Sequence, residues 1–96
     1  MIDGFNTLDL ARVCQVAPGI AQSWLDHEDE PSLHAVDRLR ITYSIMSTLA
    51  KCGVDTAEDR VEWLRHPNRA FGREAPIDLI ARGEAQPVLD YIDRFS

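Results

Sequence analysis

The sequence is poor in aromatic residues and contains no long apolar run. Aromatic residues make up 7% of its 96 residues, and no stretch approaches the ~20 apolar residues that a membrane-spanning helix requires. The beginning, Met1-Ile2-Asp3-Gly4, lacks the basic and apolar stretches of a signal peptide, so a cytoplasmic location without membrane contact is expected. The length and the 45% hydrophobic content indicate one globular domain and not a disordered chain.

Cysteine and histidine are too few and too scattered to predict a metal site. Cys14 and Cys52 are far apart in the sequence, and without a secretory context buried thiols are favoured over a disulfide. The histidines, His27, His34 and His66, lack the i, i+4 spacing of a zinc motif. We therefore expect neither a metal nor another cofactor.

Patterns that carry catalysis are also missing. There is no glycine-rich phosphate loop and no Gly-x-Ser-x-Gly elbow. The acidic run 26–30 lacks the alternate ligand positions and the glycine of a calcium loop, so a solvated loop is favoured. Asp90 and Asp93 are typical of a solvated helix exterior. The sequence predicts no catalytic residues, and an enzyme is the class of function that it favours least.

Negative charge is concentrated in the first third of the chain. The net charge is −6, and residues 1–37, with Arg12 as their only base, account for all of it. DNA affinity comes largely from the neutralisation of phosphates. This distribution argues against DNA binding by the first third alone, although a partner in a complex could supply positive charge.

The apolar periodicity predicts an all-α fold, a small helical bundle. Apolar and polar residues do not alternate over any sustained stretch, and hairpin turn signals are missing. Pro18, Pro76, Gly53 and Gly83 mark helix ends. Helices are expected over 8–16, 18–26, 33–51, 56–65, from Pro76 to Gly83, and over 84–95.

Capping residues and apolar faces refine these expectations. Thr7 and Ser32 are the expected N-caps of two helices, and Asp55 with Glu58 resembles a capping box. Each helix is expected to turn one apolar face towards a core, and the long helix is expected to have two. The faces are Leu8, Ala11, Cys14 and Gln15; Ile20 and Trp24; Leu33, Val36, Leu39, Tyr43 and Met46; Ile41, Ile45 and Leu49; Ala57, Val61 and Leu64; Ala85, Val88, Leu89, Ile92 and Phe95.

Three regions are expected within one compact domain: a helix-turn-helix-like region over 1–31, a central helix over 32–52 and a helical region over 53–96. In a helix-turn-helix the second helix reads DNA, and here it would expose Gln22 and Ser23. The alternative is that this helix simply packs into the core.

An ordered connection in the last third is the most distinctive feature. Pro67-Asn68 stops a helix, and Asn68 suits a turn stabilised by its own side chain. Phe71 is expected to return an aromatic ring to the core. Such a segment is a rigid connection between helices, and a long ordered loop in a small domain also commonly carries a binding surface.

These motifs resemble the toxin-binding domain of the MbcA/ParS/Xre antitoxin family. The resemblance is strong over residues 53–96 and weaker towards the N-terminus. It rests on Trp63-Leu-x-x-Pro67-Asn68-x-x-Phe71, Pro76-x-Asp78-Leu79-Ile80-x-x-Gly83-Glu84 and Val88-Leu89-x-x-Ile92.

The resemblance implies a type II antitoxin without catalysis of its own. Its partner would be a RES-domain toxin that destroys NAD⁺ and whose active site the antitoxin covers, and the complex would bind its own promoter. A homodimer or a larger assembly with the toxin is expected. The toxin-facing residues that the resemblance implies are Asn68, Arg69, Phe71, Arg82, Gly83, Glu84, Tyr91, Arg94 and Phe95.

Two other classes of function stay open beside the antitoxin. One is a transcription regulator that binds DNA by itself through residues 8–26. The other is an interaction or dimerisation module with neither role.

Overall fold

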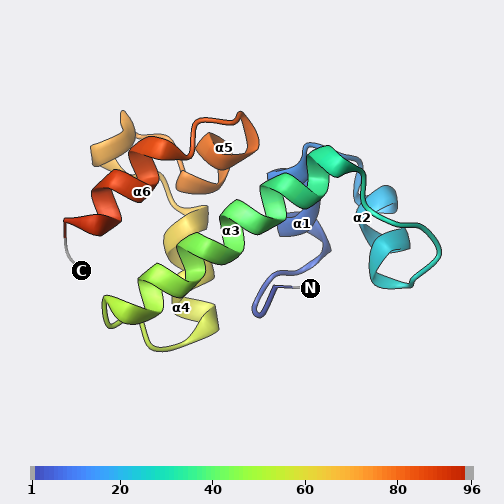
Figure 1. Ribbon diagram of the computed structural model, residues 1–96, viewed down its shortest axis with the longest axis horizontal. Coiled ribbons are helices and arrows are strands. Elements are labelled where there is room, and N and C mark those ends of the chain that lie inside the picture. Colours follow the sequence, from blue (N-terminus) through green and yellow to red (C-terminus); the bar gives the residue numbers. More distant parts are fainter. Residues whose placement is uncertain (1, 95–96) are drawn as a thin grey trace.

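The computed structural model describes residues 2–94. Over this range the chain forms six α-helices and one short 3-10 helix, and no β-strand, which confirms the all-α prediction. The elements are α1 (Thr7–Cys14), α2 (Pro18–Leu25), α3 (Leu33–Lys51), α4 (Ala57–Arg65), η1 (Arg69–Phe71), α5 (Pro76–Ala81) and α6 (Gln86–Asp93) (Figure 1).

Helix α3 forms the spine of the molecule. It has 19 residues and runs obliquely through a body of 40 × 25 × 20 Å (Figure 1). Helices α1, α4, α5 and α6 all contact it. Helix α2 lies at one end of the molecule, whereas α4 and α6 lie towards the other (Figure 1). Helix α1 also packs against α5, so the N-terminal helices and the last third of the chain are in direct contact.

The first helix begins one residue earlier than predicted. Its N-cap is Asn6 and not Thr7: the Asn6 side chain accepts a hydrogen bond from the Asp9 amide at 2.9 Å, and the Asp9 carboxylate accepts one from the Asn6 amide at 3.0 Å. This reciprocal pair is a capping box, with Asp in the third position. The Thr7 hydroxyl instead donates to Gln22 on α2.

The predicted capping box of α4 is also wrong by one position. Thr56, and not Asp55, is the N-cap, and its hydroxyl accepts a hydrogen bond from the Asp59 amide at 3.1 Å. Two possible capping pairs with the same three-residue spacing overlap here: Asp55 with Glu58, and Thr56 with Asp59. The Ser32 cap of α3 is confirmed, since its hydroxyl accepts from the Ala35 amide at 3.2 Å.

Several predicted apolar faces are rotated. Leu8 is 66% exposed, and α1 buries Leu10 and Val13 instead, together with the predicted Ala11 and Cys14. On α2 the buried pair is Ala21 and Trp24, whereas Ile20 is exposed. On α3, Leu33 and Tyr43 are exposed, so the first predicted stripe enters the core only in part. Buried residues from every helix form one common core, which includes Leu10, Val13, Trp24, Ile45, Leu49, Val61, Leu64, Phe71, Ile77, Ile80, Val88 and Ile92.

The last helix is shorter than the predicted 84–95. Helix α6 spans Gln86–Asp93, and Ala85, Val88 and Ile92 form its buried face. Leu89 is half-buried. The predicted face residue Phe95 lies outside the described residues.

Two arginine–aspartate pairs connect α1 to the last third of the chain. Arg65 on α4 donates two hydrogen bonds, of 2.8 and 2.5 Å, to the carboxylate of Asp9. Arg12 donates two, of 2.8 and 2.7 Å, to Asp78 on α5. Asp9 is only 5% exposed. A bidentate arginine–carboxylate pair fixes the orientation of the two side chains as well as their distance. The two pairs therefore hold α1 in a defined position relative to α4 and α5.

Burial and pairing act in opposite directions on Asp9. Burial raises the pKa of this carboxyl, but the hydrogen bonds from Arg65 and from the Asn6 amide, with the charges of Arg65 and Arg12, outweigh it. The pKa of Asp9 therefore lies below its ordinary value.

Both cysteines are free thiols, as predicted. Cys14 lies in the core, where burial raises the pKa of its thiol to about 11. Such a group packs as a small apolar side chain.

Candidate functional site

The connection between α4 and α5 is a closed and ordered loop. The Asn68 side chain accepts a hydrogen bond from the Ala70 amide at 2.9 Å, which confirms the predicted side-chain-stabilised turn. The backbone of Asn68 pairs with that of Glu74, which closes the loop at its base. Gly72 has φ 65°, a left-handed conformation that glycine adopts without strain. The loop therefore holds η1 in a defined position.

Phe71 anchors this loop in a cluster of three aromatic rings. It is 9% exposed, and its ring meets Trp63 of α4 and Tyr91 of α6 edge-on, with centroids 6.2 and 5.3 Å apart. Trp63 and Tyr91 are stacked, with centroids 6.4 Å apart. Edge-on and offset arrangements are the ones that aromatic rings prefer. The cluster fixes α4, η1 and α6 relative to one another, so the predicted return of Phe71 to the core is confirmed.

A groove of about 410 Å³ opens beside this cluster, between η1 and α6. Three of the residues expected to face a toxin line it: Phe71, Tyr91 and Arg94. The other lining residues are Ala70, Pro87 and Asp90. Within residues 2–94 the structure shows no ion pair of the Arg94 guanidinium. The groove thus combines an aromatic wall with an exposed cation, and tyrosine and arginine are enriched among the residues that contribute most to binding in protein interfaces. We call this surface the η1–α6 groove.

A signal for the lining residues that were not predicted is present in the sequence. Pro87 and Asp90 share the i, i+3, i+4, i+7 spacing of the predicted residues Tyr91 and Arg94. Pro87 and Asp90 are exposed on this side of α6, whereas Tyr91 is half-buried and packs against the core. Asp90 accepts a hydrogen bond from Gln86 at 2.8 Å, which holds its carboxylate along the helix. No periodic pattern identifies Ala70 as a lining residue, because the conformation of the α4–α5 loop decides where it lies.

A second group of expected residues lies at the turn between α5 and α6. Arg82 donates hydrogen bonds to both carboxylate oxygens of Glu74, each at 2.7 Å, and one to Glu84 at 2.9 Å. Hydrogen bonds to Glu74 and then to Glu84 raise the pKa of Arg82, and the bonds from Arg82 lower the pKa of Glu74. The main contact of Arg82 is therefore internal: it ties the α5–α6 turn to the loop that carries η1.

Gly83 occupies a position in that turn that no other residue fits easily. Its φ of 82° is left-handed, and a Cβ atom there would lie 3.0 Å from Nη2 of Arg38. Glu84 is exposed beside it. The structure places Arg82, Gly83 and Glu84 together, but not among the residues that line the η1–α6 groove.

Arg69 is exposed on η1, next to Ala70 of the groove. No ion pair of its guanidinium occurs among residues 2–94. Phe95, the last residue expected to face the toxin, is not part of the described chain.

The residues predicted to read DNA form internal hydrogen bonds. The Gln22 amide accepts from the Thr7 hydroxyl at 2.7 Å and donates to Asp26 at 3.1 Å. The Ser23 hydroxyl donates to the carbonyl of Ile20 at 2.7 Å. Helices α1 and α2 pack against each other across the short segment 15–17. Base recognition by Gln22 would require these hydrogen bonds to be exchanged.

Other kinds of site are not evident in the part of the chain that is described. No group of three His, Cys, Asp or Glu side chains among residues 2–94 could hold a metal ion. None of the helices in that range is both long and apolar enough to cross a membrane.

Comparison with known proteins connects this geometry to a family. No curated protein and no solved structure matches the chain. Residues 54–96 match the antitoxin Xre/MbcA/ParS C-terminal toxin-binding domain. The match includes α4, η1, α5 and α6. The aromatic cluster and the η1–α6 groove, which α4, η1 and α6 build, therefore lie within it. Residues 54–96, slightly less than half of the chain, therefore carry the toxin-binding domain of the Xre/MbcA/ParS antitoxin family.

Proposed function

We propose that the chain is a type II antitoxin that binds a RES-domain toxin in the cytoplasm and stops it from degrading NAD⁺. The observation that carries the proposal is the match of residues 54–96 to a toxin-binding domain. The same residues hold the η1–α6 groove, whose aromatic wall and exposed Arg94 are of the kind that anchors protein partners. In this proposal the antitoxin acts by occupying the toxin's active-site cleft and performs no chemistry itself.

Co-expression with the toxin encoded in the neighbouring reading frame tests the proposal. Cells that carry the toxin alone should lose NAD⁺ and stop growing, and cells that carry both proteins should keep their NAD⁺ and grow. The purified proteins should migrate as one complex. A neighbouring protein that neither binds this chain nor depletes NAD⁺ would contradict the proposal.

The end of α6 is the part that we expect to reach the toxin's active site. Arg94 follows the last residue of α6 and lines the η1–α6 groove. The double variant Arg94→Ala/Phe95→Ala should reduce inhibition of the toxin at least about tenfold, since an arginine at an interface is a frequent hot spot. NAD⁺ consumption by purified toxin, titrated with antitoxin, measures the effect. Unchanged inhibition would indicate that the essential contact lies in the loop 68–71 and not at the end of α6.

Co-repression of its own operon is a second proposed role, through α1 and α2. Their packing across a short turn favours it. In residues 1–37 the only base is Arg12, and its guanidinium pairs with Asp78. Little charge is therefore left to neutralise phosphates. A gel shift with upstream DNA at physiological salt should show no band for the isolated chain and a retarded band for the toxin complex. Tight binding by the isolated chain would identify an autonomous regulator instead.

A further inference from the structure

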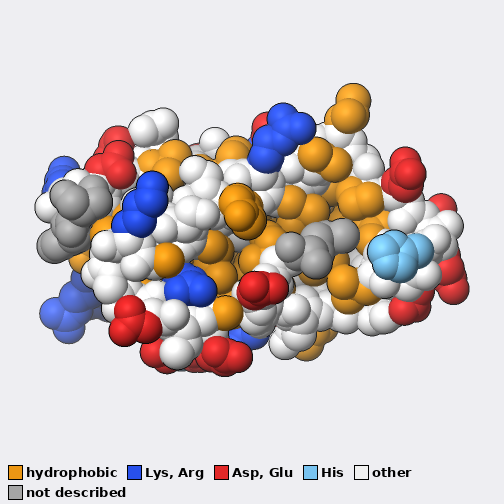
Figure 2. Space-filling view, turned by 60° about the horizontal axis from the view of Figure 1, so that its bottom comes forward, with side chains coloured by type: hydrophobic (Ala, Val, Ile, Leu, Met, Phe, Trp, Pro, Cys, Tyr) orange, Lys and Arg blue, Asp and Glu red, His pale blue; other side chains and the backbone are white. Residues whose placement is uncertain are grey.

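Cationic side chains are distributed unevenly over the surface of the molecule. Figure 2 shows lysine and arginine side chains over the middle of one face and towards the end that carries α6, whereas acidic side chains gather at the end that carries α2. Ion pairs neutralise four of the ten lysine and arginine side chains, and within residues 2–94 the other six form none. The four that are paired are Arg12, Arg38, Arg65 and Arg82.

Three of the six unpaired cations lie on or next to the η1–α6 groove. Arg94 lines the groove, and Arg69 and Arg73 lie on the loop that forms its other wall, on either side of Phe71. All three arginine side chains are exposed. The segment 63–73 contains no acidic residue, so no carboxylate of the loop itself neutralises them. We call Arg69, Arg73 and Arg94 the arginine rim.

Arg73 is held in a backbone conformation that a glycine adopts more easily. Its φ is 69°, in the left-handed region, and it directly follows Gly72, which has φ 65°. The closed loop imposes this conformation, because the Arg73 amide donates to the carbonyl of Asn68 at 3.0 Å. A side chain with a Cβ atom carries a conformational cost in this region. Strained positions of this kind cluster at sites where the side chain has a function.

Negative charge near the groove follows the middle of α6 and not η1. Asp90 lines the groove and accepts a hydrogen bond from Gln86, and Asp93 lies three positions further along the same helix. Glu74, at the end of the loop, accepts hydrogen bonds from Arg82 on both carboxylate oxygens. An anionic segment is therefore attracted to η1 and repelled by the middle of α6, which defines its path through the groove.

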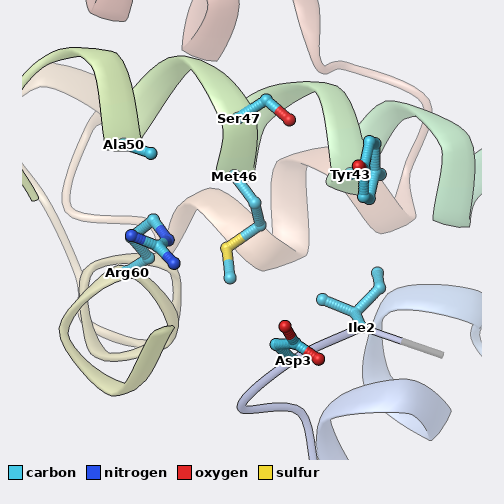
Figure 3. A pocket seen from close by; sticks show the side chains of 7 residues that line it. All are labelled: Ile2, Asp3, Tyr43, Met46, Ser47, Ala50 and Arg60. Carbon is cyan, nitrogen blue, oxygen red and sulfur yellow. The ribbon is translucent and has the colours of Figure 1, made fainter. Parts of the chain in front are cut away.

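A second groove, of about 260 Å³, lacks this bias. It is bounded by the segment 2–3, by α3 and by α4, and its charged residues are one of each sign, Asp3 and Arg60 (Figure 3). Arg60 donates to the carbonyl of Val54 at 2.6 Å, so the chain itself already uses this guanidinium. A partner's carboxylate gains less there, because a hydrogen bond has to be given up first.

We propose that the η1–α6 groove binds an acidic segment of the toxin. Its carboxylates pair with the arginine rim, and an adjoining apolar side chain packs against Phe71 and Tyr91. The inference rests on the proposed antitoxin function and names the chemistry of the segment that the groove receives. Arginine binds carboxylates through two parallel hydrogen bonds. Phosphates of DNA would leave the aromatic wall unused, and α2, which would read DNA, lies at the other end of the molecule (Figure 1).

The rate of association between the purified chain and the toxin tests the charge complementarity. Arg69→Glu/Arg73→Glu should associate at least about tenfold more slowly than the wild type, because charges at the rim of an interface steer the encounter. The wild-type rate should fall steeply between about 10 mM and about 1 M ionic strength, over which the screening length shrinks from about 30 to about 3 Å. The rate of the double variant should fall far less. Stopped-flow fluorescence measures both.

Arg40→Glu/Lys51→Glu is the matched control. It changes the net charge equally at two exposed cations of α3 that form no ion pair and do not line the groove. Its association rate should stay within about twofold of the wild type. Circular dichroism should be the same for the wild type and both double variants.

Arg73→Gly separates binding from folding. Glycine relieves the left-handed backbone, so the melting temperature should stay equal or rise, whereas the affinity for the toxin should fall at least about fivefold. A purely structural role of Arg73 would instead lower the melting temperature and would overturn its assignment to the rim. Asp90→Asn should strengthen binding, because it removes a charge that repels the acidic segment.

The outcomes distinguish this inference from the proposed function. A wild type that does not bind the toxin overturns both. Toxin binding that is insensitive to ionic strength, or a rim variant that associates as fast as its control, overturns only the acidic segment. Loss of operator binding by the toxin complex of the rim variant, with toxin binding unchanged, would assign the arginine rim to DNA and also overturn it.

Discussion

Substitution of Ala70 by Trp is expected to abolish tight toxin binding while the fold is kept. Ala70 is exposed on η1 and lines the η1–α6 groove next to Phe71. An indole at this position fills the groove that a toxin side chain would otherwise enter. The loss of one anchoring contact in a protein interface costs about 2–4 kcal/mol, which corresponds to a roughly 30- to 1,000-fold weaker affinity. Titration calorimetry with the toxin measures the change.

Ala17→Trp is the matched control for this prediction. Ala17 is also exposed and lies outside the helices, before α2 and away from the groove. The control should bind the toxin as the wild type does. Equal affinity for Ala70→Trp and the wild type would show that the toxin contacts another surface. The turn that holds Arg82 and Glu84 would then be the next candidate, because both residues belong to the expected set, are exposed and lie outside the groove.

Substitution of Arg65 by Met is expected to lower the free energy of unfolding more than the loss of an exposed ion pair does. It leaves the carboxylate of Asp9, which is 5% exposed, without its guanidinium partner. Removal of one partner of a buried ion pair costs about 3–5 kcal/mol. Arg65 itself is 30% exposed, and solvent weakens the interaction, so a smaller loss of about 2–3 kcal/mol in the free energy of unfolding is expected. Urea denaturation monitored by circular dichroism measures it.

Arg12→Met provides the comparison on the same helix. Arg12 and Asp78 also form a fork-shaped pair, but their side chains are 40% and 41% exposed. The cost should be only about 0–1 kcal/mol, as for most surface pairs. Similar losses for the two variants would show that the burial of Asp9 has no energetic consequence.

The effect of Arg65→Met should depend on pH in one direction. The folded protein holds the pKa of Asp9 below its ordinary value, so the pair stabilises the fold above the unfolded pKa of ~3.9. This stabilisation disappears as the pH falls through the lowered pKa of the folded state. The difference in unfolding free energy between the wild type and the variant should therefore be largest near neutral pH and should shrink below about pH 4. A difference that does not change with pH would contradict the assigned charge of Asp9.

Local signals in the sequence determined where most helices begin and end. Pro18 and Pro76 lack an amide hydrogen that the first turn of a helix leaves unpaired, and both lie in the first turn. Gly53 and Gly83 lie at helix ends with left-handed backbones. Asn68 builds its own turn. These effects act within a few residues, so no information about distant parts of the chain is needed to predict them. The family could likewise be recognised from short motifs in residues 54–96.

Only the tertiary structure decided which side of a helix is buried and which residues meet. The period of a short helix allows several apolar faces, and packing of α1 between α2, α3 and α5 selected Leu10 over Leu8. The η1–α6 groove joins Phe71 to Tyr91 and Arg94 across an intervening helix. The Asp9–Arg65 pair spans 56 positions. Distances of this kind depend on how α3 and the aromatic cluster arrange the other helices in space. Hydrophobic spacing along the chain carries no information about which partner each face will find.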